Sequence, residues 1–216
     1  MPQSAPTGGL PAVDHLIWVV PDLAWGMDEI ERRLGERPAV GGRHPALGSH
    51  NALLALGSDT YLEIMAADPG LPRPARGRLF GLDGLQEPRL ATWVLRCEAI
   101  EAVAAQAADR GLDLGAIHAG SRERPDGTVV AWKITDPYAA RLQGVVPFLI
   151  AWGDTPHPAR SAPAAGRLRE LRIEHPEPAA VRGALACLGL ELAVRPGQQP
   201  RLVATIDGPA GEFRLA

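Results

Sequence analysis

Residues 13–20 read Val13-Asp14-His15-Leu16-Ile17-Trp18-Val19-Val20, and residues 60–65 read Thr60-Tyr61-Leu62-Glu63-Ile64-Met65. Both stretches are typical of strands, and each embeds a polar side chain, His15 or Glu63, in apolar sequence. Alternate side chains of a strand share one face, so each group is either buried with a partner or faces a cavity. An imidazole and a carboxylate on neighbouring strands form half of a divalent-metal site, an acid–base pair or a structural hydrogen-bonded pair.

The composition is that of an ordinary globular protein. Of the 216 residues, 46% are hydrophobic and 22% are charged, and the net charge is −3 with a pI near 6.1. This charge gives no footprint for nucleic acid or an anionic membrane, and no apolar stretch approaches the ~20 residues that span a bilayer. The N-terminus lacks the features of a signal peptide, and Cys97 and Cys187 have no metal-type spacing. We therefore expect a cytoplasmic protein with reduced thiols.

Three stretches of the chain repeat one order of elements: strand, helix, then three more strands. The repeat predicts an α+β fold of tandem βαβββ units. We place paired units at 9–68 and 88–155, forming one domain over 9–155. A Pro-rich linker at 156–166 then leads to a third βαβββ-like unit at 167–216.

Local signals support these units. In the first unit, Pro21-Asp22 predicts a helix start, apolar residues recur at helical spacing as far as Leu34, and Gly35 ends the helix. In the second unit, Pro125-Asp126-Gly127 predicts a turn between two strands.

The repeated pattern, with a histidine in the first strand and a glutamate in the fourth, resembles the vicinal-oxygen-chelate superfamily of glyoxalases, bleomycin-resistance proteins and dioxygenases. The sequence is similar to the glyoxalase-like subgroup at Asp14-His15-Leu16, Gly42-Arg43-His44-Pro45, Ser49-His50-Asn51-Ala52-Leu53-Leu54-Ala55-Leu56, Tyr61-Leu62-Glu63 and Pro147-Phe148-Leu149-Ile150-Ala151-Trp152-Gly153. The resemblance covers residues 13–154 well and the third unit in outline. It implies two paired units that form cupped mixed sheets, curled around one cleft.

In that superfamily, metal ligands typically come from the first and fourth strands of each unit. The resemblance gives His15 and Glu63 these two positions in the first unit. Aligning the second unit on the first puts Ala91 opposite His15 and Leu149 opposite Glu63. Neither residue binds a metal, so the usual set of three or four protein ligands is incomplete.

Two further histidines of the first unit are candidates for the missing functions. We expect His50, at the start of a strand, to be a third metal ligand or a catalytic base beside Glu63; the alternative is a strand-edge histidine bonded to local backbone. A set of His15, His50 and Glu63 with open positions suits iron, manganese, zinc or nickel. His44 and Arg43 lie in an expected loop and are candidates for substrate binding, with Arg43 gripping an anionic group; an exposed loop is the alternative.

Aromatic residues make up only 5% of the chain, yet several gather in the strands of the second unit. They form either an apolar wall for a ligand or part of the core. These residues are Trp93, Trp132, Phe148 and Trp152.

These observations predict a glyoxalase-like enzyme of lyase, isomerase or dioxygenase type, acting on a small molecule with a divalent metal at His15 and Glu63. One alternative is a non-catalytic protein that binds or sequesters a small molecule, and another is a structural protein whose ancestral site is lost. Units of this superfamily also pair between chains, so in a homodimer the second subunit could supply the missing metal ligands. We expect His118, His157 and His175 to be structural, since His157 lies between two prolines of the linker.

Overall fold

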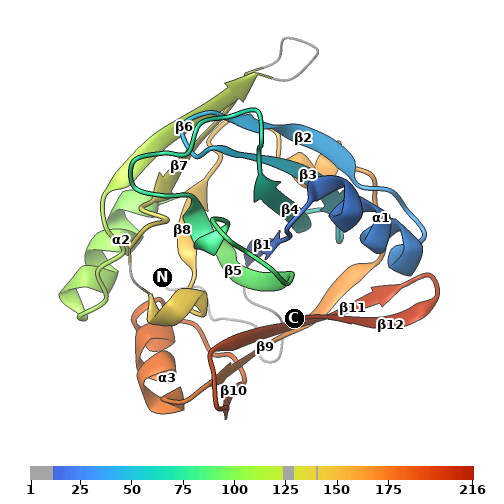
Figure 1. The fold of residues 1–216 in the computed structure, drawn as a ribbon. Coiled ribbons are helices and arrows are strands. Elements are labelled where there is room, and N and C mark those ends of the chain that lie inside the picture. The colour runs from blue at the N-terminus through green and yellow to red at the C-terminus, as the bar shows by residue number, and fades with distance from the viewer. Residues whose placement is uncertain (1–11, 124–128, 140) are drawn as a thin grey trace.

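The computed structural model describes residues 12–216 except 124–128 and 140, so the expected turn at 125–127 and the first residues of the unit at 9–68 lie outside the described residues. Three βαβββ units follow one another along the chain (Figure 1). The first consists of β1 (Val13–Val19), α1 (Leu23–Leu34), β2 (Ala39–His44), β3 (Ser49–Ala55) and β4 (Tyr61–Ala67).

The second and third units repeat this order. The second consists of β5 (Arg89–Arg96), α2 (Ile100–Asp109), β6 (Ile117–Glu123), β7 (Val129–Thr135) and β8 (Phe148–Ala151). The third consists of β9 (Arg167–His175), α3 (Pro178–Cys187), β10 (Val194–Pro196), β11 (Arg201–Gly208) and β12 (Gly211–Leu215). Short 3-10 helices lie in the connections: η1 (Leu79–Gly81), η2 (Leu142–Gly144) and η3 (Pro158–Arg160).

Helix α1 shows how local sequence sets the element boundaries. The Asp22 carboxylate accepts a hydrogen bond of 2.8 Å from the Trp25 backbone N–H, which caps the N-terminus. Gly35 ends the helix at φ 76°, a left-handed conformation that glycine adopts without a side-chain clash. The predicted helix limits are therefore confirmed, and the apolar face between them is buried against the sheet.

The first two units share one eight-stranded sheet in the order β2-β3-β4-β1-β5-β8-β7-β6. In each unit the first strand pairs in parallel with the fourth, as β1 with β4 and β5 with β8. Strands β1 and β5 pair antiparallel at the centre and join the two units. The sheet curls so that its two arms face each other (Figure 1), as expected for cupped mixed sheets.

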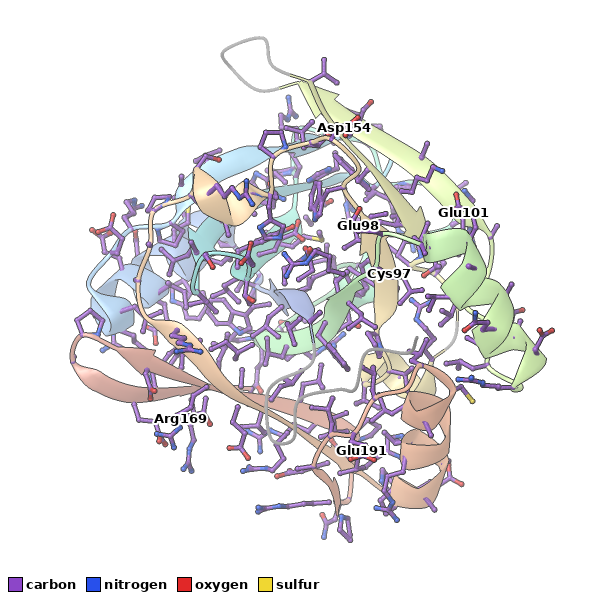
Figure 2. All side chains as sticks on the ribbon, turned by 180° about the vertical axis from the view of Figure 1, so that it is seen from behind. Cys97, Glu98, Glu101, Asp154, Arg169 and Glu191 are labelled. Carbon is purple, nitrogen blue, oxygen red and sulfur yellow. The ribbon has the colours of Figure 1, made fainter. Side chains whose placement is uncertain are left out.

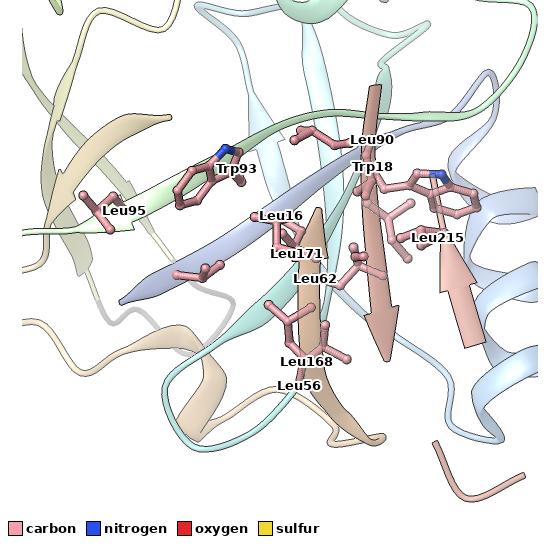
Figure 3. Packing of buried hydrophobic residues seen from close by; sticks show 14 of the residues in the cluster. Leu16, Trp18, Leu56, Leu62, Leu90, Trp93, Leu95, Leu168, Leu171 and Leu215 are labelled. Atoms are coloured by element: carbon pink, nitrogen blue, oxygen red, sulfur yellow. The ribbon is translucent and has the colours of Figure 1, made fainter. Parts of the chain in front are cut away.

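The curled sheet has a hydrophobic cluster on each face. The inner cluster includes Ile17, Leu53 and Phe148. The outer cluster joins the sheet to the helices and to the third unit, whose strands form a second sheet in the order β10-β9-β11-β12. Figure 3 shows leucines of the second sheet packed beneath the first sheet; those labelled are Leu168, Leu171 and Leu215. Each fully buried leucine contributes roughly 1.5–3 kcal/mol, so this interface fixes the back of the curled sheet.

Charged side chains lie on the outside of the molecule, such as Glu101 on α2 and Arg169 on β9 (Figure 2). Cys97 and Cys187 are free thiols, each half-buried. Among the described residues, no helix combines the length and the apolar character needed to cross a membrane.

Candidate functional site

Asp14 is fully buried behind the inner wall of the curled sheet and accepts three hydrogen bonds. Nδ1 of His15 lies 2.7 Å from Oδ1, while Nε1 of Trp152 and Nε2 of His157 lie 2.9 and 3.0 Å from Oδ2. Burial alone would raise the pKa of Asp14, but the hydrogen bonds from His15 and His157 outweigh it and hold the pKa well below its ordinary range. Asp14 is therefore a carboxylate at neutral pH.

This carboxylate fixes the tautomers of both histidines. A carboxylate only accepts hydrogen bonds, so His15 carries its proton on Nδ1 and His157 carries its proton on Nε2. The His157 assignment is supported independently, because its Nδ1 accepts from the Ala159 backbone N–H at 3.3 Å. In neutral His15, Nε2 is consequently a lone pair.

The lone pair of His15 faces the second carboxylate of the site. Nε2 lies 3.4 Å from Oε2 of Glu63, and both side chains are buried. Oε1 of Glu63 accepts a hydrogen bond of 2.5 Å from the side-chain amide of Asn51, which leaves Oε2 for the histidine side. Two acceptors at this distance need a shared proton or a cation between them.

The pair opens onto a cavity of about 100 Å³ inside the curled sheet. His15, Asn51 and Glu63 line one side of it, and the His15 ring stacks on Tyr61 with centroids 4.5 Å apart. The rest of the lining is mostly apolar or aromatic, including Ile17, Leu53, Met65, Leu79, Phe80, Trp132, Ile134, Phe148, Ile150 and Trp152. Such a site combines a few fixed polar groups with an apolar body for the ligand.

His15 and Glu63 fit two neighbouring positions of a divalent metal ion. Two ligands of a tetrahedral ion, each at about 2.1 Å, lie about 3.4 Å apart, which matches the distance between Nε2 and Oε2. Asp14 and Asn51 hold the other polar atoms of these two ligands, the arrangement in which outer-shell groups orient metal ligands. Among the described residues, no group of three or more His, Cys, Asp or Glu side chains could hold a metal, so His15 and Glu63 have no third protein ligand of these types there.

The structure places His50 away from this cavity. Strand β3 sends Asn51 and Leu53 to the cavity, so His50 shares the opposite face with Ala52 and Leu54 of the outer cluster. Arg43 is also absent from the lining, because it is exposed and its guanidinium bonds the Asp68 carboxylate at 2.6 and 3.2 Å.

The other expected substrate-binding residues divide in the same way. His44, Trp132, Phe148 and Trp152 line the cavity. Trp93 points to the outer cluster, where it is fully buried and its indole N–H donates to the Val145 carbonyl at 2.8 Å. It is core rather than wall, since its neighbours in β5 take the inner face.

Among its described residues, the second unit offers no ligand opposite His15 and Glu63. Leu149, which the alignment set opposite Glu63, belongs to the outer cluster, and its neighbours Phe148 and Ile150 face the cavity instead. Ala91 lies in the inner cluster. The half of the cavity contributed by described residues of the second unit is therefore apolar apart from the indole N–H groups.

Four residues of the site were not singled out from the sequence: Asp14, Asn51, Tyr61 and His157. Asp14 and Asn51 are direct neighbours of residues that were, and a polar pair within a buried strand is the signal that could have found them. His157 lies in a Pro-rich connection, where no periodicity indicates burial. Its pairing with Asp14, 143 positions away, becomes visible only in the fold.

Comparisons with known proteins agree with this architecture. A family model described as a glyoxalase-like domain matches residues 13–189. No curated protein matches the sequence. The fold is similar to the crystal structure of a hypothetical protein from Staphylococcus aureus, with a TM-score of 0.66, 12% identity, and coverage of 94% of this chain and 98% of that one.

Two epimerase structures are also similar, at lower TM-scores. Methylmalonyl-CoA epimerase from Mycobacterium tuberculosis has a TM-score of 0.45 and 19% identity, with 70% of this chain and 94% of that one covered. A Streptomyces coelicolor methylmalonyl-CoA epimerase in complex with 2-nitronate-propionyl-CoA has a TM-score of 0.45 and 16% identity, with 69% and 100% covered. The family match spans most of the chain, so this protein belongs to the glyoxalase-like domain family of the vicinal-oxygen-chelate superfamily.

Proposed function

We propose that this protein is an enzyme that acts on a small molecule bound against His15 and Glu63. The observation that carries the proposal is the 3.4 Å approach of Nε2 of His15 to Oε2 of Glu63 at the wall of a cavity. Two buried acceptors held face to face are costly unless a cation or proton lies between them. A buried pair that lowers stability, and that is nevertheless held in place by hydrogen bonds to Asp14 and Asn51, is typical of a catalytic or binding site.

His15 and Glu63 would hold a divalent metal ion, with zinc, iron, manganese and nickel all compatible with nitrogen and oxygen ligands. When bound, such an ion acts as a Lewis acid toward paired oxygens of a substrate. Asp14 holds Nδ1 of His15 so that Nε2 is aimed at the site, and Asn51 leaves Oε2 of Glu63 available. Lyase, isomerase and dioxygenase reactions all fit this arrangement.

The remaining lining determines what can enter. The cavity volume of about 100 Å³ is well below the roughly 300–1,000 Å³ of sites that enclose drug-sized ligands. The enclosed part of the substrate is therefore small. Water is excluded from this part of the cavity by the apolar side chains of Phe148, Ile150 and Trp132. Glu63, with Oε2 not held by Asn51, is the group placed to take up or return a proton in that dry site.

A non-catalytic binding protein is the second candidate. The observation that favours it is the apolar second half of the cavity, where Phe148 and Ile150 stand in place of ligands. On this account a ligand is held by the aromatic and aliphatic wall alone, and the proton shared by His15 and Glu63 is structural.

Metal analysis of the purified protein separates the two candidates. Protein expressed in metal-replete, chelator-free medium should contain one divalent ion per chain by mass spectrometry, and His15→Ala should lose it, with affinity reduced more than about 100-fold. His118→Ala, which changes an exposed histidine on β6, is the matched control and should keep the metal. Native mass spectrometry of the same samples shows whether metal is held by monomer or homodimer.

The opposite results are equally clear. Wild-type protein free of metal under these conditions would overturn the metalloenzyme proposal. Saturable binding of a small apolar ligand that is recovered unchanged would then support the binding protein.

A further inference from the structure

A second cavity, of about 470 Å³, lies beside the first. Phe80 and Pro137 line both cavities and so form the partition between them. The other residues that line the second cavity come mainly from the start of β5 and from the loop around η2, and they include Arg89, Arg141 and Gln143. The site formed by His15 and Glu63 makes no use of these three residues.

Arg141 is a buried cation without a carboxylate partner among the described residues. Only 6% of its surface is exposed, and the one side-chain hydrogen bond that it makes to described residues runs from Nη1 to the Asp136 carbonyl at 2.5 Å. Nε is buried and makes no hydrogen bond. The Asp136 carboxylate is engaged elsewhere, 3.7 Å from Arg76 and bonded to the Tyr138 backbone N–H.

The buried Arg141 guanidinium keeps its charge and has hydrogen-bond donors that no described carboxylate uses. Burial lowers the pKa of Arg141 to about 10, even though the charge of Asp136 raises it in part, so the group is still charged at neutral pH. Buried charges are normally paired, because removing them from water is expensive. The guanidinium fork therefore has free donors in the geometry that fits a carboxylate or phosphate.

The other polar groups of the cavity are mainly donors as well. Arg89 lies at the exposed side, forms no ion pair among the described residues and donates to the Phe80 carbonyl at 2.6 Å. Nε2 of His175 donates to Oε1 of Gln143 at 3.1 Å, which leaves both N–H groups of that amide available as donors. Glu177 is the single acidic side chain among the lining residues that the structure describes, and it is exposed.

Backbone strain is concentrated at the same place. Among the described residues, the non-glycine positions with positive φ are Phe80, Leu142 and Gln143, at 57°, 47° and 53°. All three line the second cavity. Side-chain-bearing residues adopt this conformation at a cost, and such strain tends to persist at ligand sites, where surrounding contacts enforce it.

We propose that the second cavity binds an oxyanion, a carboxylate or phosphate group, through the Arg141 guanidinium, with Arg89 and Gln143 as further donors. A free anion and the acid group of a larger ligand share this chemistry. The Phe148 ring lies near both sites, 5.6 Å from the Arg141 guanidinium carbon and 6.4 Å from the His15 ring. The proposal goes beyond the chemistry at His15 and Glu63 and does not depend on a metal there.

Thermal unfolding with added anion tests the proposal. At constant ionic strength set with chloride, phosphate should raise the Tm of the wild type saturably, by about 5 °C at a concentration of about one hundred Kd. Arg141→Met should abolish the saturable rise, and should fold, because removing an unpaired buried charge is often neutral or stabilising. Phosphate also stabilises proteins by general exclusion, so Arg195→Met, which changes an exposed arginine on β10, serves as the matched control and should respond like wild type.

Two further arms complete the test. Acetate and benzoate distinguish the sources of the anion: benzoate binding at least about tenfold tighter than acetate indicates a larger ligand with an acid group, and equal affinities indicate a free anion. Arg89→Met at the exposed side should weaken binding several-fold and decides the matter if Arg141→Met does not fold. A wild type without a saturable response, an Arg141→Met response equal to that of wild type, or, where Arg141→Met does not fold, an unchanged Arg89→Met affinity would overturn the proposal.

Discussion

The two sides of the main cavity come from two copies of the same βαβββ arrangement, the first and the second unit, yet they differ in chemistry. The first unit presents His15, Asn51 and Glu63, whose polar atoms are supported by a buried network behind them. The second unit presents Phe148 and Ile150 at its inner face. The repeated βαβββ arrangement therefore determines which strand positions face the cavity. The residue type at each of these positions determines whether that side of the cavity binds polar or apolar groups.

The support behind the polar side is the feature whose loss should cost most. Asp14→Asn keeps the volume of the side chain but places an amide among the His15, Trp152 and His157 donors. Breaking a buried charged network in this way costs about 3 kcal/mol of unfolding free energy, measurable by urea denaturation. Asp22→Ala is the matched control, since loss of that helix cap costs about 1 kcal/mol. Equal losses in the two variants would show that the Asp14 network adds nothing special.

The same carboxylate should make stability depend on pH. The folded-state pKa of Asp14 lies below its unfolded value of 3.8, so its stabilisation is present above about pH 4 and is lost as the pH falls toward the folded-state value. Wild-type unfolding free energy should therefore fall by about 2 kcal/mol from this group between pH 5 and low pH. Asp14→Asn should show a flatter profile over that range, and parallel profiles for the two proteins would contradict the assignment.

Strand β3 allows the two faces of one strand to be compared directly. Asn51→Ala removes the hydrogen bond to Oε1 of Glu63 and should weaken metal binding about 10- to 100-fold, as for other outer-shell residues. His50→Ala, one residue away on the opposite face, should change the affinity less than about twofold. Competition with a chromophoric chelator measures both. A large loss in His50→Ala would restore the sequence-based expectation that His50 is a ligand.

The fold could be predicted from the sequence because its signals are local. Asp22 and Gly35 mark the ends of α1, and the repeated order of elements predicts three βαβββ units. His15 and Glu63 stand out for the same reason, as polar residues within apolar strands. Their direct contact confirms that the two strands bring them together.

Which side chains of a strand face the cavity and which face the outer cluster could not be predicted in the same way. Strands β3 and β5 are buried on both faces, so their sequences are continuous apolar runs without the alternation that distinguishes one face from the other. This is why His50 was expected in place of Asn51, and why Trp93 was grouped with the cavity aromatics. His157 could not be found because its partner, Asp14, is remote in sequence.

The smallest expected effect comes from giving the apolar side a ligand. Phe148 pairs with Val94, which pairs with His15, so its side chain is level with the histidine across β5. Phe148→His should therefore add a third protein ligand, the second nitrogen, and tighten metal binding by up to about tenfold relative to Phe148→Leu, which loses the ring without adding a ligand. Isothermal titration with zinc measures the pair. If both variants bind zinc equally, the two sides of the cavity are too far apart to share one ion, and the polar side alone, completed by water or substrate, must hold it.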